Sequence, residues 1–227
     1  MDAGNRWEQF ARDRAEYYIL TDMDPRGDEE ALDRFFASGR QQAEAILADV
    51  AGWLRRFDTA IEIGCGVGRL AIPLAGRFRR VVAVDIAPTM LAKLRTHAAR
   101  FGVENIETAH VGDAWHENAD ADFVFSWLVL QHVERLDDIR DLLRRTAAAL
   151  RADGVASLQF DTRPATPAYR LRQALPDFLL PRPWRRGIRR VRRSGRELLG
   201  LFADCGLVVV AEHRPGTSAH VFILARS

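Results

Sequence analysis

The sequence predicts an α/β protein in which a doubly wound, mostly parallel sheet of seven strands carries helices on both faces. Two observations lead to this prediction. Between residues 58 and 160, short apolar strands alternate with amphipathic helices, which is the pattern of βαβ units with right-handed crossovers. Beyond residue 206, two apolar strands flank the turn cluster Arg214–Thr217, which predicts that the sheet ends in an antiparallel hairpin.

The expected elements follow the chain in order. Apolar strands such as Val81–Val84 suit a sheet that is buried on both faces. Pro88 stands in the first turn of a helix, where its fixed φ and missing N–H are tolerated. The expected strands are Ala60–Ile63, Val81–Val84, Ile106–Val111, Phe123–Phe125, Val155–Phe160, Leu207–Ala211 and Ala219–Ala225, and the helices among them are Arg69–Phe78, Pro88–Arg100, Val129–Leu150 and Glu197–Phe202.

Length and composition fit one such domain with an appendage. The chain has 227 residues, 48% of them hydrophobic and 28% charged, so it can bury a core of ordinary size. No apolar run approaches the roughly 20 residues of a membrane helix, and Met1–Phe10 lacks the apolar stretch of a signal peptide. Cys65 and Cys205 offer neither a disulfide framework nor metal-ligand spacing. We therefore expect a cytoplasmic protein with no membrane partner and no metal.

Residues 1–57 precede the first strand and are predicted to form a helical cap. Aromatic residues recur there at helical spacing, and a turn cluster at residues 21–28 ends the first helix. Two more helices are expected, at Glu29–Phe36 and Arg40–Leu54, separated by Ser38-Gly39. The cap either packs against the edge of the sheet or serves as a lid that excludes water from an active site.

Residues 58–227 are expected to form the core domain, with an insertion at about 161–196 that is rich in proline and arginine. The net charge of the chain is +2, but Arg163–Arg196 holds eleven arginines and a single acid, Asp177. Three interpretations of this arginine run stay open. It forms a solvated surface or contacts an acidic partner, it binds an acidic small molecule, or it follows the phosphates of a nucleic acid.

A glycine-rich turn directly follows the first expected strand. Gly64, Gly66 and Gly68 are spaced two apart, and an amphipathic helix begins at once after them. Glycine permits positive φ and a close approach of ligand to backbone, which a Cβ would block. The G-x-G-x-G spacing differs from the G-x-G-x-x-G of dinucleotide-binding enzymes. Cys65, inside the turn, is expected to be a small filler and not a reactive thiol.

Three further motifs follow the turn in order. Asp85 ends the second strand, Gly112-Asp113-Ala114 follows the third, and Asp122–Val133 reads D-x-V-x-S-x-x-V-L-x-H-V from the fourth. Together with the glycine turn, they resemble the class I S-adenosylmethionine-dependent methyltransferases, specifically the small-molecule branch, over residues 58–160. The resemblance implies a Rossmann-like sheet, with S-adenosylmethionine as methyl donor and S-adenosylhomocysteine as product.

The resemblance also implies how these motifs hold the cofactor. The turn Gly64–Gly68 would lie against it, and the Asp85 carboxylate would accept hydrogen bonds from its ribose hydroxyls. NAD binding is the alternative interpretation of an acid at this strand end. Glu62 and the backbone of Ser126 would orient the methionine end. The remaining implied contacts are Ile86, Met90, Asp113, Ala114 and Trp115 at the adenine, with core packing as the alternative for Trp115, and Arg40 at the cofactor carboxylate.

Transfer from a sulfonium needs alignment of the acceptor more than acid–base chemistry, because the methyl group is already activated. His132 is the candidate base, since an imidazole titrates near neutral pH, and packing beside the cofactor is its alternative role. Tyr17, Tyr18, Asp161 and His213 are the candidates for lining the acceptor pocket.

We therefore predict a methyltransferase that acts on an O or N atom of a small metabolite, with an acidic or specialised-metabolism compound as candidate acceptor. The fourth-strand motif lacks the Asn-Pro-Pro-Tyr or Asp-Pro-Pro-Tyr sequence of many base- and amide-methylating enzymes, which disfavours nucleic acid as a partner. The alternatives are an RNA or protein methyltransferase that uses the arginine run, and a non-catalytic cofactor-binding scaffold. A homodimer is compatible with the sequence.

Overall fold

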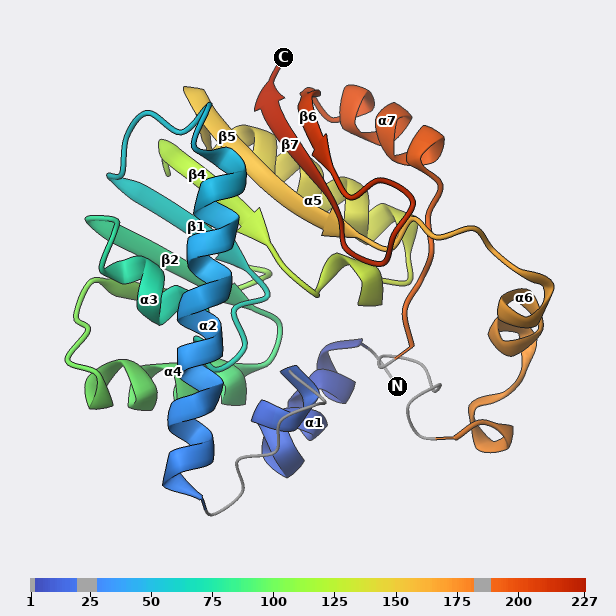
Figure 1. Cartoon of the computed structure of the whole chain (residues 1–227), viewed down its shortest axis with the longest axis horizontal. Coiled ribbons are helices and arrows are strands. Elements are labelled where there is room, and N and C mark those ends of the chain that lie inside the picture. The colour runs from blue at the N-terminus through green and yellow to red at the C-terminus, as the bar shows by residue number, and fades with distance from the viewer. Residues whose placement is uncertain (1–2, 20–27, 182–188) are drawn as a thin grey trace.

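The computed structural model describes residues 3–19, 28–181 and 189–227 (Figure 1). Seven of its strands form one sheet in the order β3-β2-β1-β4-β5-β7-β6, in which β7 runs antiparallel to both of its neighbours. The predicted doubly wound sheet with a C-terminal hairpin is confirmed. The strands are β1 (Thr59–Ile63), β2 (Arg80–Asp85), β3 (Ile106–His110), β4 (Ala121–Ser126), β5 (Leu150–Phe160), β6 (Leu207–His213) and β7 (His220–Arg226).

Helices cover both faces of this sheet, because alternate strand residues point to opposite sides. Ala60 of β1 packs with α2, α3 and α4, whereas Ile61 and Ile63 pack with α5 and α7. Among the described residues, no helix is both long and apolar enough to cross a membrane. The helices are α1 (Ala3–Ile19), α2 (Glu29–Val50), α3 (Ala71–Ala75), α4 (Pro88–Arg100), η1 (Leu130–His132), α5 (Leu136–Ala149), α6 (Pro167–Ala174), η2 (Asp177–Leu179) and α7 (Gly195–Asp204).

Helix α2 corrects the prediction of two helices separated at Ser38-Gly39. It is one continuous helix of 22 residues, in which the Ser38 hydroxyl donates to the Phe35 carbonyl at 2.7 Å. The glycine meets a packing requirement instead, because a Cβ at Gly39 would lie 2.1 Å from the carbonyl oxygen of Arg69. Gly39 therefore lets α2 approach the chain that follows the glycine turn.

Other boundaries also differ from the expected ones. The predicted helix Arg69–Phe78 is shortened to the five residues of α3, because Arg69 and Leu70 still belong to the turn. The predicted helix Val129–Leu150 is divided into η1 and α5. Strand β5 begins at Leu150, although Asp153-Gly154 was expected to form a turn before it. At Gly154 a Cβ would lie 2.5 Å from the carbonyl of Ala121, so glycine is required where β5 passes β4 and not where the chain turns.

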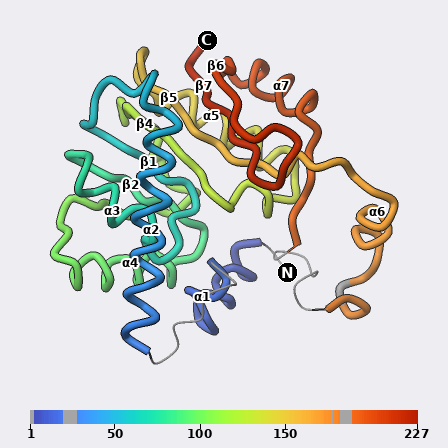
Figure 2. Tube along the Cα trace, in the orientation of Figure 1, coloured from blue at the N-terminus to red at the C-terminus, as the bar shows by residue number. Residues whose placement is uncertain are grey.

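The insertion leaves the sheet after β5 and returns to it before α7, carrying α6 to one side of the molecule (Figure 2). Helix α6 was not among the expected elements, and it has no buried residue. The turn expected at residues 21–28 lies outside the described residues up to residue 27, as do residues 182–188 of the arginine run.

Candidate active site

The glycine turn closes over the carboxyl ends of β1 and β2. Gly64, Gly66 and Gly68 have φ values of +79°, +54° and +90°. The backbone N–H groups of Gly64 and Cys65 both donate to the carbonyl of Val84, at 2.7 and 3.0 Å. A Cβ at Gly64 would lie 2.4 Å from the side chain of Val129. Glycine is therefore required by the backbone conformation and by the space at this turn.

Asp85, at the end of β2, holds the turn in place. Its Oδ2 accepts the Gly66 N–H at 2.8 Å, and its Oδ1 accepts the Ala87 N–H at 2.9 Å. Burial raises the pKa of this carboxyl, and the backbone donors oppose that effect. A carboxylate oxygen can accept more than one hydrogen bond. Both oxygens therefore keep lone pairs for a ligand hydroxyl, as the predicted ribose contact requires.

Glu62 and Arg69 are two buried charged side chains near the turn whose charges act on each other. Their side chains are 3% and 5% exposed. Burial raises the pKa of Glu62 well above its usual value, against the positive charge of Arg69. The Oε2 atom of Glu62 is buried and has no hydrogen-bond partner among the described residues. Such an atom is costly unless a donor reaches it, and the ammonium group of a methionine moiety is a fitting donor.

Sequence reasoning overlooked Arg69 and selected Arg40. Arg69 lies next to the last glycine of the turn, and its Nη1 donates to the Ser38 hydroxyl at 3.3 Å. Burial lowers the pKa of Arg69, and the charge of Glu62 opposes this. Arg40 is exposed and lines a shallow surface groove with Phe36 and Phe101. The structure thus places Arg69, not Arg40, beside Glu62, and its position directly after the turn was the available indication.

His110 joins the ends of β2 and β3. Its Nδ1 accepts the Gly112 N–H at 3.1 Å, so Nε2 carries the proton and donates to the Ile86 carbonyl at 3.2 Å. The Asp113 carboxylate accepts the backbone N–H of His110 at 2.7 Å. Ile86 and Asp113, two of the predicted adenine contacts, are thereby held next to each other, and Ala114 follows them as an exposed residue.

Three other predicted cofactor contacts belong to the core. Met90 is 2% exposed and packs with α1 to α4. Trp115 is 7% exposed, packs on the α5 side, and donates its indole N–H to the Val111 carbonyl at 3.2 Å. The structure therefore favours the core interpretation of Trp115. Burial raises the pKa of Cys65 well above its usual value, so its thiol stays protonated, as a filler would.

The fourth-strand motif continues the same edge of the sheet. The Ser126 hydroxyl donates to the Ile63 carbonyl at 3.0 Å and so ties β4 to β1 above the turn. Leu128 follows with a φ of +63°, and its N–H donates to the Gln159 side chain at 2.6 Å. This kink directs the chain into η1, which ends at His132.

His132 is a neutral imidazole at pH 7. Burial, followed by the positive charge of Arg190, lowers its pKa to about 4. The indole of Trp7 lies edge-on to the ring at 5.9 Å between centroids. A general base works best when its pKa is near the operating pH, so His132 is a weak proton acceptor here. Its Nδ1 atom is buried without a partner among the described residues.

Helix α1 lies across these elements. Glu8 accepts hydrogen bonds from the backbone N–H of Thr89, at 3.0 Å, and from the Thr89 hydroxyl, at 2.5 Å, at the start of α4. A Cβ at Gly66 would lie 2.6 Å from Ile19. With Trp7 on His132, α1 therefore contacts the turn, the start of α4 and η1.

The four predicted acceptor-lining residues lie on α1, directly after β5 and at the end of β6. Tyr17 and Tyr18 are neighbours on α1, with ring centroids 5.4 Å apart. Asp161 is fully buried and is held by both Nε and Nη2 of Arg163, at 2.9 and 2.6 Å. Its carboxylate is therefore already engaged by a neighbouring guanidinium. His213 is the last residue of β6.

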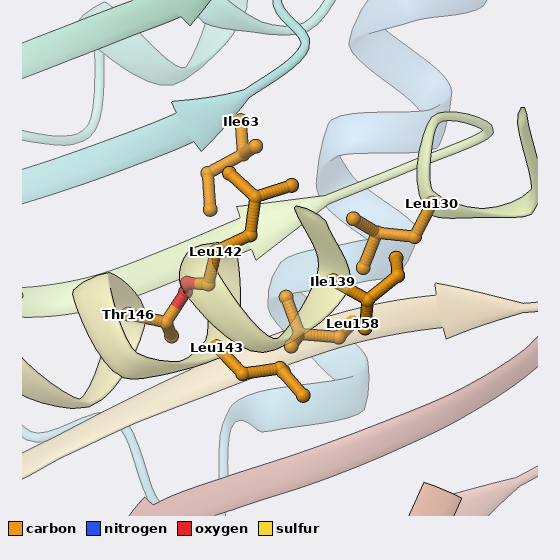
Figure 3. Close-up of a pocket in the computed structure, with 7 residues that line it drawn as sticks. All are labelled: Ile63, Leu130, Ile139, Leu142, Leu143, Thr146 and Leu158. Carbon is orange, nitrogen blue, oxygen red and sulfur yellow. Dashed lines mark hydrogen bonds between the residues drawn. The ribbon is translucent and has the colours of Figure 1, made fainter. Parts of the chain in front are cut away.

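A small apolar pocket lies between α5 and the sheet (Figure 3). It leaves no room for a water molecule, and its single polar side chain, Thr146, donates to the Leu142 carbonyl at 2.8 Å. It is therefore part of the core. Among the described residues, no group of three or more His, Cys, Asp or Glu side chains is placed to hold a metal ion.

Comparison with known proteins agrees with this geometry. Residues 60–154 match the family described as "Methyltransferase domain". The chain is 39% identical over 57 residues to a probable cobalt-precorrin-6B C(15)-methyltransferase of Methanothermobacter thermautotrophicus, a match over 25% of this chain and 30% of the relative. It is 43% identical over 64 residues to a tRNA/tmRNA (uracil-C(5))-methyltransferase of Campylobacter curvus, over 28% of this chain and 18% of the relative. The chain thus spans a third or less of the length of each of these curated relatives.

Solved structures share the fold over most of the chain. The magnesium protoporphyrin IX methyltransferase of Synechocystis PCC 6803 with bound SAH has a TM-score of 0.66 at 19% identity, over 98% of this chain and 97% of that one. The mitomycin 7-O-methyltransferase MmcR has a TM-score of 0.60 at 22% identity, over 97% of this chain and 68% of that one. The matched domain, the strand order and the glycine turn agree with the fold of S-adenosylmethionine-dependent methyltransferases.

Proposed function

We propose that the chain transfers a methyl group from S-adenosylmethionine to an O or N atom of a small molecule. The observation that carries this proposal is the buried, unpartnered Oε2 of Glu62 beside the three left-handed glycines. A buried acceptor of this kind fits the ammonium of a methionine moiety, and the open turn fits the close approach of the rest of the ligand.

The residues around the turn share the work of binding. Gly64, Gly66 and Gly68 keep the backbone clear, and Asp85, already fixed by two backbone donors, presents its remaining lone pairs to the ribose hydroxyls. Arg69 opposes the rise in the pKa of Glu62 and so favours its charged form. When bound, the cofactor supplies a methyl group on a positively charged sulfur.

The arrangement of α1 supports a small acceptor. This helix contacts the turn, the start of α4 and His132, so it covers the edge of the sheet where the cofactor would lie. We infer that residues 1–57 act as a cap that excludes water, and that the insertion at 161–196 completes it. Solved structures with the same fold include methyltransferases named for small-molecule acceptors, whereas the curated relatives matched over the shared domain include RNA methyltransferases.

The site provides positioning more than proton transfer. His132 has a pKa of about 4 and Asp161 is paired with Arg163, so neither is suited to take a proton at neutral pH. We therefore infer that the acceptor enters with a lone pair available or loses its proton to water, and that rate enhancement comes from alignment.

Calorimetry with S-adenosylmethionine and S-adenosylhomocysteine tests the proposal. Both should bind, and Asp85→Ala should weaken binding by on the order of 1–3 kcal/mol, because hydrogen bonds to a charged acceptor are lost. Asp153→Ala, an exposed acid in the first part of β5, is the matched control and should bind as the wild type. Absence of binding by the wild type at high micromolar concentration would contradict the proposal.

A further inference from the structure

The last part of the insertion returns to the carboxyl edge of the sheet as an extended segment, Arg189–Arg193. The N–H of Val191 donates to the Gln131 carbonyl at 2.6 Å, and the N–H of Arg193 donates to the Asp161 carbonyl at 3.0 Å. A parallel β-bridge also joins Asp161 to Arg192. The segment is thus fixed against η1 and the end of β5, on the edge that carries the glycine turn.

Three buried nitrogen atoms at this crossing have no hydrogen-bond partner in the described parts of the chain. They are Nε of Arg189, Nη1 of Arg193 and Nδ1 of His132. The other Arg193 nitrogen, Nη2, donates to the Val133 carbonyl at 2.6 Å, so its guanidinium lies against the residue that follows His132. Nη1 of Arg189 donates to the Arg172 carbonyl at 3.3 Å, so part of this guanidinium is already bonded. Because nearly all buried polar groups in native proteins are satisfied, the three unpartnered nitrogen atoms are suited to bind a ligand.

The local charge is positive. Arg193 is 5% exposed, and among the described residues its guanidinium donates to backbone carbonyls and not to a carboxylate. Burial lowers the pKa of Arg193, with the charge of Glu197 opposing. The buried acid nearby, Asp161, is already bonded twice by Arg163. Glu197 is exposed, and within the described residues no carboxylate bonds to Arg193, so an anion entering here would be stabilised.

The neighbouring ion pairs do not remove this excess. Glu134 follows η1, and its carboxylate is paired with Arg6 at 3.5 Å. Arg190 is exposed, and its charge acts on His132 and helps to lower the pKa of that ring. The crossing therefore combines arginine donors with a neutral imidazole, a donor set that matches the oxygens of a carboxylate or a phosphate.

We propose that Arg189 and Arg193, with Arg190 nearby, bind an oxyanion group of the methyl acceptor at a position other than the reacting atom. The inference rests on the proposed methyl transfer and names the acceptor class as one that carries a carboxylate or phosphate. The bound group is not the reacting one, because a guanidinium on an oxygen that loses its charge on methylation would favour the ground state over the transition state.

The test uses the full chain without methyl donor and four simple probes. Binding of succinate and of inorganic phosphate is measured by calorimetry and by thermal unfolding, against neutral succinamide and against sodium chloride at equal ionic strength. Succinate or phosphate should bind saturably and succinamide should not, and the stronger of the two anions identifies the type of oxyanion group.

The variants Arg189→Met and Arg193→Met should each weaken anion binding at least tenfold. Arg77→Met is the matched control, because Arg77 is an exposed arginine between α3 and β2, away from this crossing, and it should leave anion binding unchanged. Arg193 also bonds to backbone carbonyls, so circular dichroism checks its fold, and Arg189→Met tests the site if Arg193→Met does not fold. With an identified acceptor, Arg189→Met should raise KM and leave kcat nearly unchanged.

Two results would overturn the proposal. One is that neither anion binds more tightly than succinamide. The other is that the variants do not differ as expected: Arg189→Met binds the anions as tightly as the wild type does, or Arg77→Met weakens anion binding as much as Arg189→Met does. These measurements contain no methyl donor. A failure of S-adenosylhomocysteine to bind the wild type would therefore contradict the proposed function without changing the anion result. The two failures are thus distinguishable.

Discussion

At the scale of single residues, His132 is the side chain whose environment most changes its chemistry. A histidine in the fourth-strand motif is a natural candidate for a base when only the sequence is considered. The ring is buried and contacts Trp7 edge-on. Its burial, together with the charge of Arg190, instead lowers its pKa to about 4. The ring is thus a neutral part of the site, which agrees better with packing than with proton transfer.

This shift predicts how stability depends on pH. Between pH 4 and 6.5 the unfolded chain binds a proton at His132 and the folded chain does not, so stability rises with pH across this window and is lost on acidification. His132→Gln should flatten this part of the plot of unfolding free energy against pH, and the effect at pH 4 should be on the order of 3 kcal/mol. Urea unfolding at several pH values measures it.

His116→Gln is the control for that series, because His116 is a half-buried histidine on the chain between β3 and β4. The free energy of unfolding of His116→Gln should fall on acidification as that of the wild type does. An unchanged pH dependence in His132→Gln would show that the buried imidazole does not cause the loss.

Gly66 in the glycine turn and Gly102 after α4 allow the cost of backbone strain to be compared with the cost of a steric contact. Gly66 and Gly102 have similar φ values, +54° and +65°, but a Cβ at Gly66 would lie 2.6 Å from Ile19, whereas nothing lies within 4 Å at Gly102. Gly102→Ala should cost about 1–2 kcal/mol from the left-handed backbone alone. Gly66→Ala should cost more, because α1 must also shift.

Equilibrium unfolding of both alanine variants measures the difference. Equal losses of stability would mean that Ile19 moves freely and that α1 does not press on the turn. A larger loss in Gly66→Ala, together with weaker cofactor binding, would support the close contact between α1 and the turn.

At the scale of elements, Glu8 is one of the side chains that attach α1 to the rest of the molecule, at the start of α4. Burial pushes the pKa of Glu8 upward, but its hydrogen bonds with Thr89 outweigh this and leave the pKa below its usual value. A carboxylate at a helix N-terminus is also favoured by the helix dipole. Glu8 therefore acts on α4 as a capping side chain supplied by another helix.

Glu8→Ala should reduce stability by about 1 kcal/mol, as the loss of a helix cap does. Hydrogen exchange of residues 3–19 should become faster, while the strands of the sheet keep their protection. Glu44→Ala, an exposed acid on α2, is the control. Unchanged exchange in α1 after Glu8→Ala would show that its other contacts suffice to hold it.

Some elements near the glycine turn were predicted well, whereas α3 was predicted too long and the helices of the insertion were not predicted. Strand β2 and helix α4 begin and end within a residue of their expected bounds, because each has a strong apolar pattern and α4 has its proline in the first turn. Helix α6 was missed because it buries nothing, and a helix without a buried face leaves no apolar period to recognise.

At the scale of the whole molecule, the order of the motifs already implied the site. Parallel strands place their carboxyl ends at one edge of a sheet, so the glycine turn, Asp85, Asp113 and Ser126 had to meet there once the βαβ pattern was accepted. This explains why the cofactor edge could be located from sequence while the acceptor site could not.

The sequence by itself determined the sheet, its hairpin and the edge that carries the cofactor motifs, because periodicity and turn chemistry are local properties of the chain. Only the tertiary structure decided that the charges of Arg69 and Glu62 act on each other and that Arg163 forms an ion pair with Asp161. It also decided that the segment Arg189–Arg193 lies against η1. Each of these pairings depends on where distant backbone segments meet and on which side chains lose their water there, and no local pattern encodes either.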